Sequence, residues 1–266
     1  MAQLPYPEYL AHMRADSVRF RELLADCDPN APVPSCPAWT AADLLWHLGE
    51  VQHWWTAMVV DRPAGPDAYQ EPDRPATYDG LLAFYDQGLD GLPRALAAAD
   101  PTEEAWSWSS DPDHHRVGWI ARRQAHEALI HRLDAELTTD DLTALDPTLA
   151  ADGVAECLAV MYGGLPPWGT FDPLPRHVEF RMPDVGTSVW VQLGLFSGQP
   201  PEGERIDGQP DLHVVEEPGD VADAVVAADA GTLDAWLWHR SAADVDLSGD
   251  EATLDHLRAV LRQPID

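Results

Sequence analysis

The chain has 266 residues, of which 45% are hydrophobic and 23% are charged, as is typical of a soluble globular protein, and this length favours two domains. Its formal net charge at pH 7 is −30, and it contains no lysine. These values exclude nucleic acid and an anionic membrane surface as partners, because binding to either depends on clusters of Lys and Arg.

The first part of the chain has the periodicity of amphipathic helices. Thr40 and Asp43 form a capping-box pattern that predicts a helix start, and Trp39 beside them is predicted to pack as a hydrophobic staple. Apolar residues at helical spacing predict helices at residues 9–24, from Thr40 onwards, and at 81–99, 117–137 and 149–162.

Two features interrupt this periodicity. Gly88 and Pro93 are expected to weaken the second half of the third helix. After that helix, residues 101–115 place Trp106 and Trp108 among Ser, Asp and Pro residues. We predict a long loop here that drapes across the mouth of a site.

The composition changes at the Gly- and Pro-rich run 163–167, which predicts domains at residues 1–165 and 166–266. Beyond this run apolar and polar residues alternate, as they do in strands. Strands are predicted at residues 177–181, 188–193, 212–215 and 224–227, and helices at 231–239 and 251–261. The second domain is therefore expected to be α+β.

Cysteine usage and the first residues of the sequence indicate the compartment. Cys27, Cys36 and Cys157 show no paired short spacing, which argues against a disulfide framework and for a reducing cytoplasm. The first residues lack the basic region and apolar core of a signal peptide, and no apolar run is long enough to span a bilayer. We expect a cytoplasmic protein, as a monomer or a homodimer.

One stretch, His126–Arg132, carries half of a candidate metal site. Glu127 and His131 stand four residues apart in a helical segment, so both side chains leave one face of the helix. A third donor is expected from His47, which lies in an apolar helical segment. Two imidazoles and one carboxylate suit a divalent transition metal, with zinc the first choice, and leave a coordination position open for chemistry.

Each of these residues also has a structural interpretation. A histidine in an apolar helix is commonly a hydrogen-bonded core residue, and a Glu and a His at helical spacing are commonly a surface pair. His126 competes with the proposed donors from a different face. Asp134 either orients a ligand histidine or is an ordinary surface acid, and Arg132 is expected to be solvated or ion-paired.

Several short runs of the chain form one pattern: Cys36–Thr40, Asp43–Leu44, His47–Gly49, His126–Glu127, His131–Arg132, Asp134–Ala135 and Ala150–Val154. Together these runs resemble the actinobacterial mycothiol-dependent maleylpyruvate isomerase family. This family is similar to the DinB-like metal-binding four-helix bundles and adds a smaller C-terminal α+β domain similar to sterol-carrier-like folds.

The resemblance implies a divalent metal, most simply zinc, held by His47, Glu127 and His131. It also implies a low-molecular-weight thiol cofactor, mycothiol, whose sulfur approaches the metal as a thiolate. In an isomerase the thiolate adds to a conjugated double bond, the resulting single bond rotates, and elimination returns the thiol. In an S-transferase the adduct is released. The implied substrate is a small, electrophilic, maleylpyruvate-like molecule.

The run Trp236–Arg240 resembles the Trp-rich helix of the family that ends in Arg. Arg240 is expected to bind a substrate carboxylate in catalysis, with a structural ion pair as the alternative. Arg123 is expected to supply a cation for cofactor binding. Asp134 is expected to take part in catalysis, as a base or through a ligand histidine.

Two other functions stay open on the residues alone. One is a metal-dependent hydrolase in which an activated water occupies the open position and Asp134 or another acid acts as base. The other is a non-catalytic protein that binds a metal or a small ligand.

Overall fold

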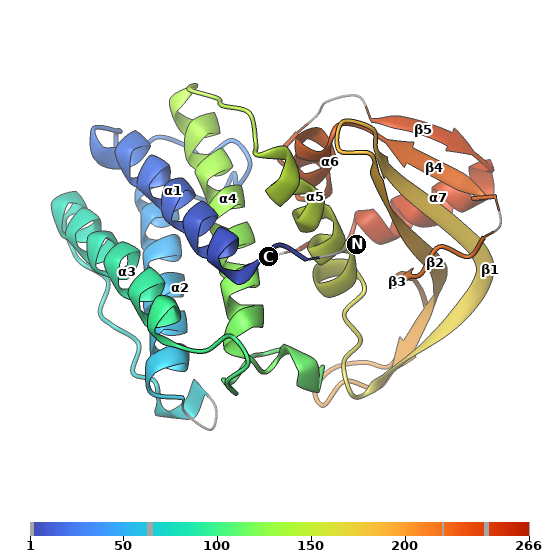
Figure 1. Ribbon diagram of the computed structural model, residues 1–266, viewed down its shortest axis with the longest axis horizontal. Helices are drawn as coiled ribbons and strands as arrows, with labels where there is room; N and C mark the ends of the chain where they lie inside the picture. The colour runs from blue at the N-terminus through green and yellow to red at the C-terminus, as the bar shows by residue number, and fades with distance from the viewer. Residues whose placement is uncertain (1–2, 63–65, 220, 242–244, 266) are drawn as a thin grey trace. The chain divides into compact units, whose positions relative to one another are not determined.

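The computed structural model describes residues 3–62, 66–219, 221–241 and 245–265 (Figure 1). The chain divides into two compact units, one over residues 4–144 and one that begins at Leu145. This division lies earlier than the boundary expected at residue 165. The reason is that helix α5 (Pro147–Glu156) packs on helix α6 (Ala230–Leu237) of the C-terminal unit.

The N-terminal unit is a four-helix bundle, as the sequence predicts. Helices α1 and α2 each contact both α3 and α4, so the four helices surround one core (Figure 1). The helices are α1 (Tyr6–Ala25), α2 (Ala41–Val60), α3 (Tyr78–Ala98) and α4 (Val117–Thr139).

Helix α2 begins at the predicted capping box. The backbone N–H of Asp43 donates to the Thr40 hydroxyl, and the Asp43 carboxylate accepts from the Thr40 N–H at 2.9 Å. These bonds satisfy two backbone donors that the first turn of a helix leaves without partners, which fixes the start of α2.

Helix α3 is continuous to Ala98, whereas Gly88 and Pro93 were expected to weaken its second half. Gly88 is buried, and a Cβ atom there would lie only 3.1 Å from the Cβ of Gln52 on α2. The glycine therefore permits a close approach of α2 and α3. Packing against α2 outweighs the low helix propensity of these residues.

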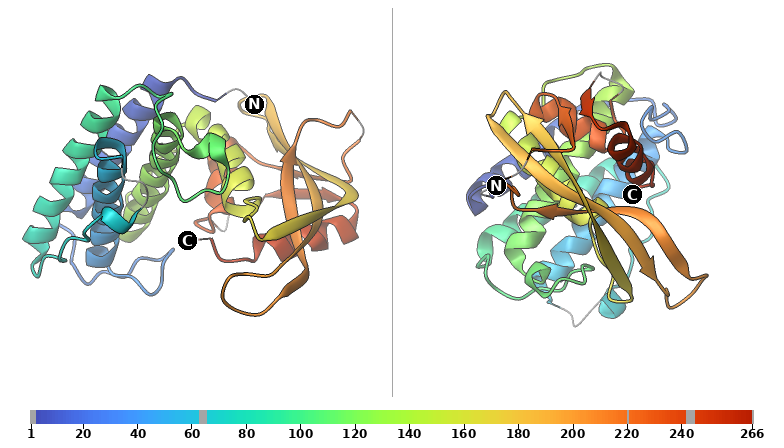
Figure 2. Two further views of the ribbon diagram at one scale, coloured as in Figure 1. Left: turned by 90° about the horizontal axis from the view of Figure 1, so that it is seen from below. Right: turned by 90° about the vertical axis from the view of Figure 1, so that its right-hand side faces the viewer.

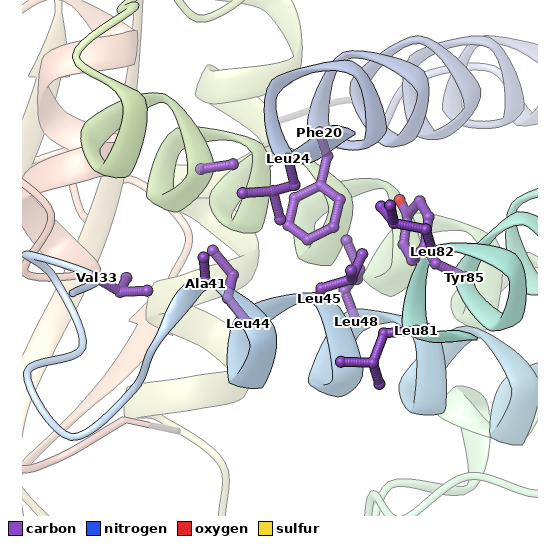
Figure 3. Close-up of a cluster of buried hydrophobic side chains, with 11 residues drawn as sticks. Phe20, Leu24, Val33, Ala41, Leu44, Leu45, Leu48, Leu81, Leu82 and Tyr85 are labelled. Atoms are coloured by element: carbon purple, nitrogen blue, oxygen red, sulfur yellow. The ribbon is translucent and has the colours of Figure 1, made fainter. Parts of the chain in front are cut away.

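The core of the bundle lies where α1, α2 and α3 meet (Figure 3). Its central aromatic pair is Phe20 and Tyr85, whose ring centroids lie 5.0 Å apart. The Tyr85 hydroxyl donates to the carbonyl of Ser17, so its burial leaves no polar atom without a partner. The buried cluster is Phe20, Leu24, Val33, Ala41, Leu44, Leu45, Leu48, Leu81, Leu82, Tyr85 and Ala135.

The C-terminal unit is α+β. After α5, the π-helical turn Cys157–Tyr162 leads to a five-stranded sheet, and helix α7 (Glu251–Leu261) packs against β3, β4 and β5. The strands are β1 (Gly169–Met182), β2 (Thr187–Gly198), β3 (Ile206–Val215), β4 (Ala224–Ala227) and β5 (Asp246–Gly249).

The spatial order of the strands is β3-β2-β1-β4-β5, and the sheet is strongly twisted (Figure 2). Strands β1 and β4 pair in parallel, and the other neighbours are antiparallel. The turn between β1 and β2 contains Gly186 in the left-handed region with φ +65°. Strand β5 was not predicted because its four residues contain a single apolar side chain, Leu247.

Candidate metal centre

Three donor residues from two helices meet in the bundle. His47 on α2 and Glu127 and His131 on α4 each offer one ligand atom, and these atoms lie within 4.8 Å of one another. Oε1 of Glu127 lies 3.1 Å from Nε2 of His131 and 3.5 Å from Nε2 of His47. The two helices therefore bring together the three side chains that the sequence proposes as ligands.

The local structure explains why these donors face one another. Glu127 and His131 are one helical turn apart on α4, so they project from the same face. Helix α2 packs on α4, and the rings of His47 and His131 meet edge to face with centroids 4.9 Å apart. The site therefore depends on helix packing and on no flexible loop.

The charge of Glu127 is stabilised by its neighbours. Burial opposes ionisation of this carboxyl, but hydrogen bonds from His131 and His47 and the charge of Arg123 outweigh burial and hold the pKa of Glu127 well below its usual range. Arg123, one turn earlier on α4, donates to Oε2 of Glu127 at 2.7 Å. Glu127 is therefore a carboxylate at neutral pH, as a metal ligand must be.

His131 is oriented by a second carboxylate. Its Nδ1 lies 2.9 Å from Oδ2 of Asp134, a fully buried residue whose Oδ1 accepts a hydrogen bond from the Ser35 hydroxyl. Burial lowers the pKa of His131, but its hydrogen bonds to Asp134 and Glu127 outweigh burial and raise that pKa to about 9. Because Asp134 occupies Nδ1, Nε2 is the nitrogen that faces the other donors.

The two separations from the Glu127 oxygen to the imidazole nitrogens fit a divalent ion. Four ligands at about 2.1 Å from a tetrahedral zinc lie about 3.4 Å from one another. The separations of 3.1 Å and 3.5 Å from Glu127 Oε1 to the two imidazole nitrogens are close to this value. Two imidazoles and one carboxylate are also donors that zinc and similar ions accept.

Two residues near the donors were not identified as part of the site from the sequence. Trp39 was interpreted only as a hydrophobic staple, and its ring lies 4.7 Å from that of His47 and 6.2 Å from that of His131. Ser35, which bonds Asp134, carries no sequence signal beyond its place in the turn before the cap of α2.

Other residues singled out in the sequence lie in different surroundings. Arg132 pairs with Asp16 and Glu136, as expected for an ion-paired residue. His126 is buried with its ring 6.3 Å from that of Tyr9, and it is not one of the three grouped donors. Arg240 lies in the C-terminal unit, where its guanidinium donates to the carbonyl of Trp238.

The Trp-containing loop is held against the bundle by aromatic contacts. Trp106 meets Trp54 of α2 edge to face with centroids 5.5 Å apart, and Trp108 meets Trp119 of α4 in the same way at 5.4 Å. Trp108 nevertheless leaves 48% of its surface exposed. The loop therefore covers the ends of α2 and α4.

The fold and the donors together define a class: a four-helix bundle with a candidate three-ligand cation site, followed by an α+β domain. Two family models match the chain. The mycothiol maleylpyruvate isomerase N-terminal domain matches residues 10–136, and the MDMPI C-terminal domain matches residues 148–256. The chain belongs to the mycothiol-dependent maleylpyruvate isomerase family, as the sequence motifs indicate.

Two solved structures have the same fold. The crystal structure of a histidine-to-alanine mutant of the mycothiol-dependent maleylpyruvate isomerase matches with a TM-score of 0.63 at 12% identity, over 93% of this chain and 96% of that one. The crystal structure of the mycothiol-dependent maleylpyruvate isomerase without that substitution matches with a TM-score of 0.58 at 14% identity, over the same shares. A search of the curated proteins finds no significant match. No helix in the described part of the chain has the length and hydropathy needed to cross a membrane.

Proposed function

We propose that this protein is a metal-dependent isomerase or S-transferase that uses mycothiol and acts on a small, electrophilic, maleylpyruvate-like substrate. The observation that carries the proposal is the convergence of His47, Glu127 and His131 from two helices. Family membership supports the choice of thiol and of substrate class, because the names of the family and of its solved members contain both mycothiol and maleylpyruvate.

In this proposal His47, Glu127 and His131 hold the divalent ion, with zinc the first choice. Such an ion, when bound, supplies a Lewis-acid site that favours the thiolate form of a thiol at neutral pH. Three protein ligands leave a coordination position for that sulfur.

The neighbouring charged residues have positioning roles in this proposal. Arg123 keeps Glu127 ionised, because its guanidinium donates to the carboxylate and its side chain is only 5% exposed. Asp134 keeps Nε2 of His131 directed at the ion through its bond to Nδ1. We propose these roles in place of direct cofactor binding by Arg123 and direct catalysis by Asp134. Arg240 keeps its proposed role of binding a substrate carboxylate.

The hydrolase alternative needs an accessible base close to the ion. Asp134 is fully buried, and its two oxygens accept from His131 and from Ser35. A carboxylate engaged in this way is poorly placed to activate a water. The arrangement therefore favours the thiol-dependent reaction.

The test is a turnover assay on zinc-loaded protein with mycothiol and maleylpyruvate, with and without a chelator. Metal-dependent change of alkene geometry supports the isomerase, and metal-dependent consumption of thiol with formation of an adduct supports the S-transferase. Cleavage of an ester or amide substrate without thiol would support the hydrolase, and zinc binding without any turnover would support a binding protein.

The ligand assignment has its own test with a matched control. His47→Ala and His131→Ala should each lower zinc content after dialysis, whereas His126→Ala should leave it unchanged. His126 is a suitable control because it is also a buried histidine of α4 and is not among the grouped donors. Unchanged zinc content in His47→Ala and His131→Ala would refute the site.

A further inference from the structure

The C-terminal unit contains a cavity of about 410 Å³ among α6, β5 and α7. It involves none of the metal-site residues. The residues that line it are Tyr162, Trp236, Leu237, His239, Ser241, Leu247, Leu254, Leu257, Arg258, Leu261 and Arg262.

The walls of this cavity are apolar. Leu254, Leu257 and Leu261 lie at helical spacing along one face of α7, and Leu237 of α6 and Leu247 of β5 complete the lining. If each methyl-sized group takes about the 30 Å³ of a water molecule, the cavity has room for about a dozen such groups. This is within the usual size range of small-molecule sites.

Among the described residues that line the cavity, the polar ones are cationic or neutral. The chain has 46 acidic residues and only 16 arginines, yet the charged residues that line this cavity in the described part of the chain are two arginines, Arg258 and Arg262. They lie one turn apart at the end of α7. In so acidic a protein, a cavity whose described charged lining residues are both positive has the charge complementary to an anion.

The two arginines differ in their partners. Arg258 is paired with Glu251 and Asp255 at 2.6 Å and 2.8 Å. Arg262 donates through Nε to the carbonyl of Arg258, and no carboxylate of the described residues pairs with it. Arg262 is therefore the cation at this cavity that is available to a ligand.

The end of the cavity is rigidly constructed. His239 follows α6 in the left-handed region with φ +59°, and its Nε2–H donates to the carbonyl of Leu261 at 2.8 Å. The Tyr162 hydroxyl donates to the carbonyl of Leu237 at 2.8 Å. The first bond ties the end of α6 to the end of α7, and the second ties the π-helical turn to α6, so the cavity is largely formed without a ligand.

We propose that this cavity binds an amphipathic monocarboxylate, with an alkyl chain of about eight to ten carbons among the leucines and its carboxylate paired with Arg262. Guanidinium and carboxylate form two parallel hydrogen bonds. The volume and the apolar lining set the length of the chain, and the charge selects an acid over a neutral lipid. This site is separate from the proposed metal centre and does not depend on its function.

The experiment is a calorimetric titration of the zinc-loaded protein with decanoate and, in parallel, with decanol. Decanoate should bind more tightly than decanol. Arg262→Gln should lower the affinity for decanoate by about fivefold and leave the affinity for decanol unchanged. Arg205→Gln is the matched control and should change neither, because Arg205 is exposed and lies outside the cavity.

A second variant, Leu247→Trp, fills the cavity from the short strand β5 and should abolish binding of both compounds. Circular dichroism and urea denaturation show that each variant is folded. Absence of decanoate binding to the unmodified protein would overturn the proposal. It would also be overturned if the Arg262→Gln variant and the unmodified protein bound decanoate with equal affinity. Binding that survives Leu247→Trp would refute this location.

Discussion

The Nδ1 of His131 lies 2.9 Å from Oδ2 of Asp134, one turn further along the same helix. This bond fixes the orientation of an imidazole whose Nε2 faces Glu127 and, beyond it, His47. A buried carboxylate behind a histidine of this kind increases its basicity and holds its tautomer.

Asp134→Asn should lower zinc affinity by about tenfold to a hundredfold, because the amide keeps the shape of the side chain but loses the charge that orients His131. Competition with a chromophoric chelator measures this affinity. Ser35→Ala, which removes only the hydrogen bond to the other oxygen of Asp134, should have a smaller effect. Equal affinity of Asp134→Asn and the unmodified protein would show that Asp134 does not support the ligand.

The position of Trp39 predicts a spectroscopic signal. Its ring lies 4.7 Å from that of His47, so Co²⁺ at the site should quench its fluorescence. Trp39→Phe should remove most of the Co²⁺-dependent quenching. Trp46→Phe is the control, because Trp46 of α2 packs on Phe84 of α3 instead. Undiminished quenching in Trp39→Phe would place the ion elsewhere.

Arg132 is next to a proposed ligand but belongs to a structural ion network. It pairs with Asp16 and Glu136, and Glu136 is fully buried. Arg132→Met should lower the free energy of unfolding by about 3 kcal/mol, because it removes the buried guanidinium that pairs with Glu136 and leaves that buried carboxylate only the bonds from Thr143 and the longer pair with Arg19. Arg21→Met, which breaks a more exposed pair with Asp86, should cost less than about 1 kcal/mol.

Urea denaturation measures both values. The Arg132→Met protein that is still folded should bind zinc with unchanged affinity. A large loss of zinc affinity in the folded variant would instead make Arg132 part of the metal centre.

Asp211 on β3 predicts a dependence of stability on pH. Burial raises the pKa of this carboxyl to about 6, although a hydrogen bond from the N–H of Leu212 lowers it in part. The folded state therefore holds the proton more tightly than the unfolded state, whose aspartate pKa is about 3.9. The stabilisation that Asp211 gives through this tighter proton binding is fully present below about pH 4, and it is lost as the pH rises through about 6.

Asp211→Asn should therefore raise the free energy of unfolding at about pH 7.5 by about 2 kcal/mol and leave it nearly unchanged at about pH 4. Denaturation at the two pH values tests this. Asp207→Asn on the same strand is the control and should have no effect at either pH, because Asp207 is exposed. A destabilised Asp211→Asn protein at the higher pH would contradict the sign of the effect.

The proposed role of Arg240 separates binding from catalysis. Arg240→Gln should raise KM for a dicarboxylate substrate by about tenfold or more, with a smaller change in kcat. The reason is that the lost guanidinium would bind the substrate carboxylate equally well in the ground state and in the transition state. Arg205→Gln serves as the control. Unchanged KM in Arg240→Gln would leave only the structural alternative for this residue.

The elements that the sequence predicts well are those whose signals are local. The capping box at Thr40 and Asp43 and the α7 helix each depend on adjacent residues. The candidate ligands were also identifiable, because Glu127 and His131 share a helix face. That His47 meets them depends on the packing of α2 on α4, which the sequence predicts only through its resemblance to a family.

Other features were not predictable because they depend on distant contacts. The close approach at Gly88 keeps α3 continuous although its residues have low helix propensity. Helix α5 belongs to the C-terminal unit because it packs on α6, which lies far along the chain. Ser35 meets Asp134 only after the bundle has formed.

The parallel pairing of β1 with β4 affects how the C-terminal unit folds. The β1–β2–β3 meander pairs strands that follow one another in the sequence. Val178 of β1, by contrast, pairs with Ala224 of β4, and the whole of β2 and β3 lies between these two residues along the chain. Closing that long loop before any pairing forms is entropically unfavourable, so the meander should assemble first and β4 with β5 should dock late. Amide protons of Val225 and Val226 should accordingly exchange with solvent sooner than those at the centre of β2.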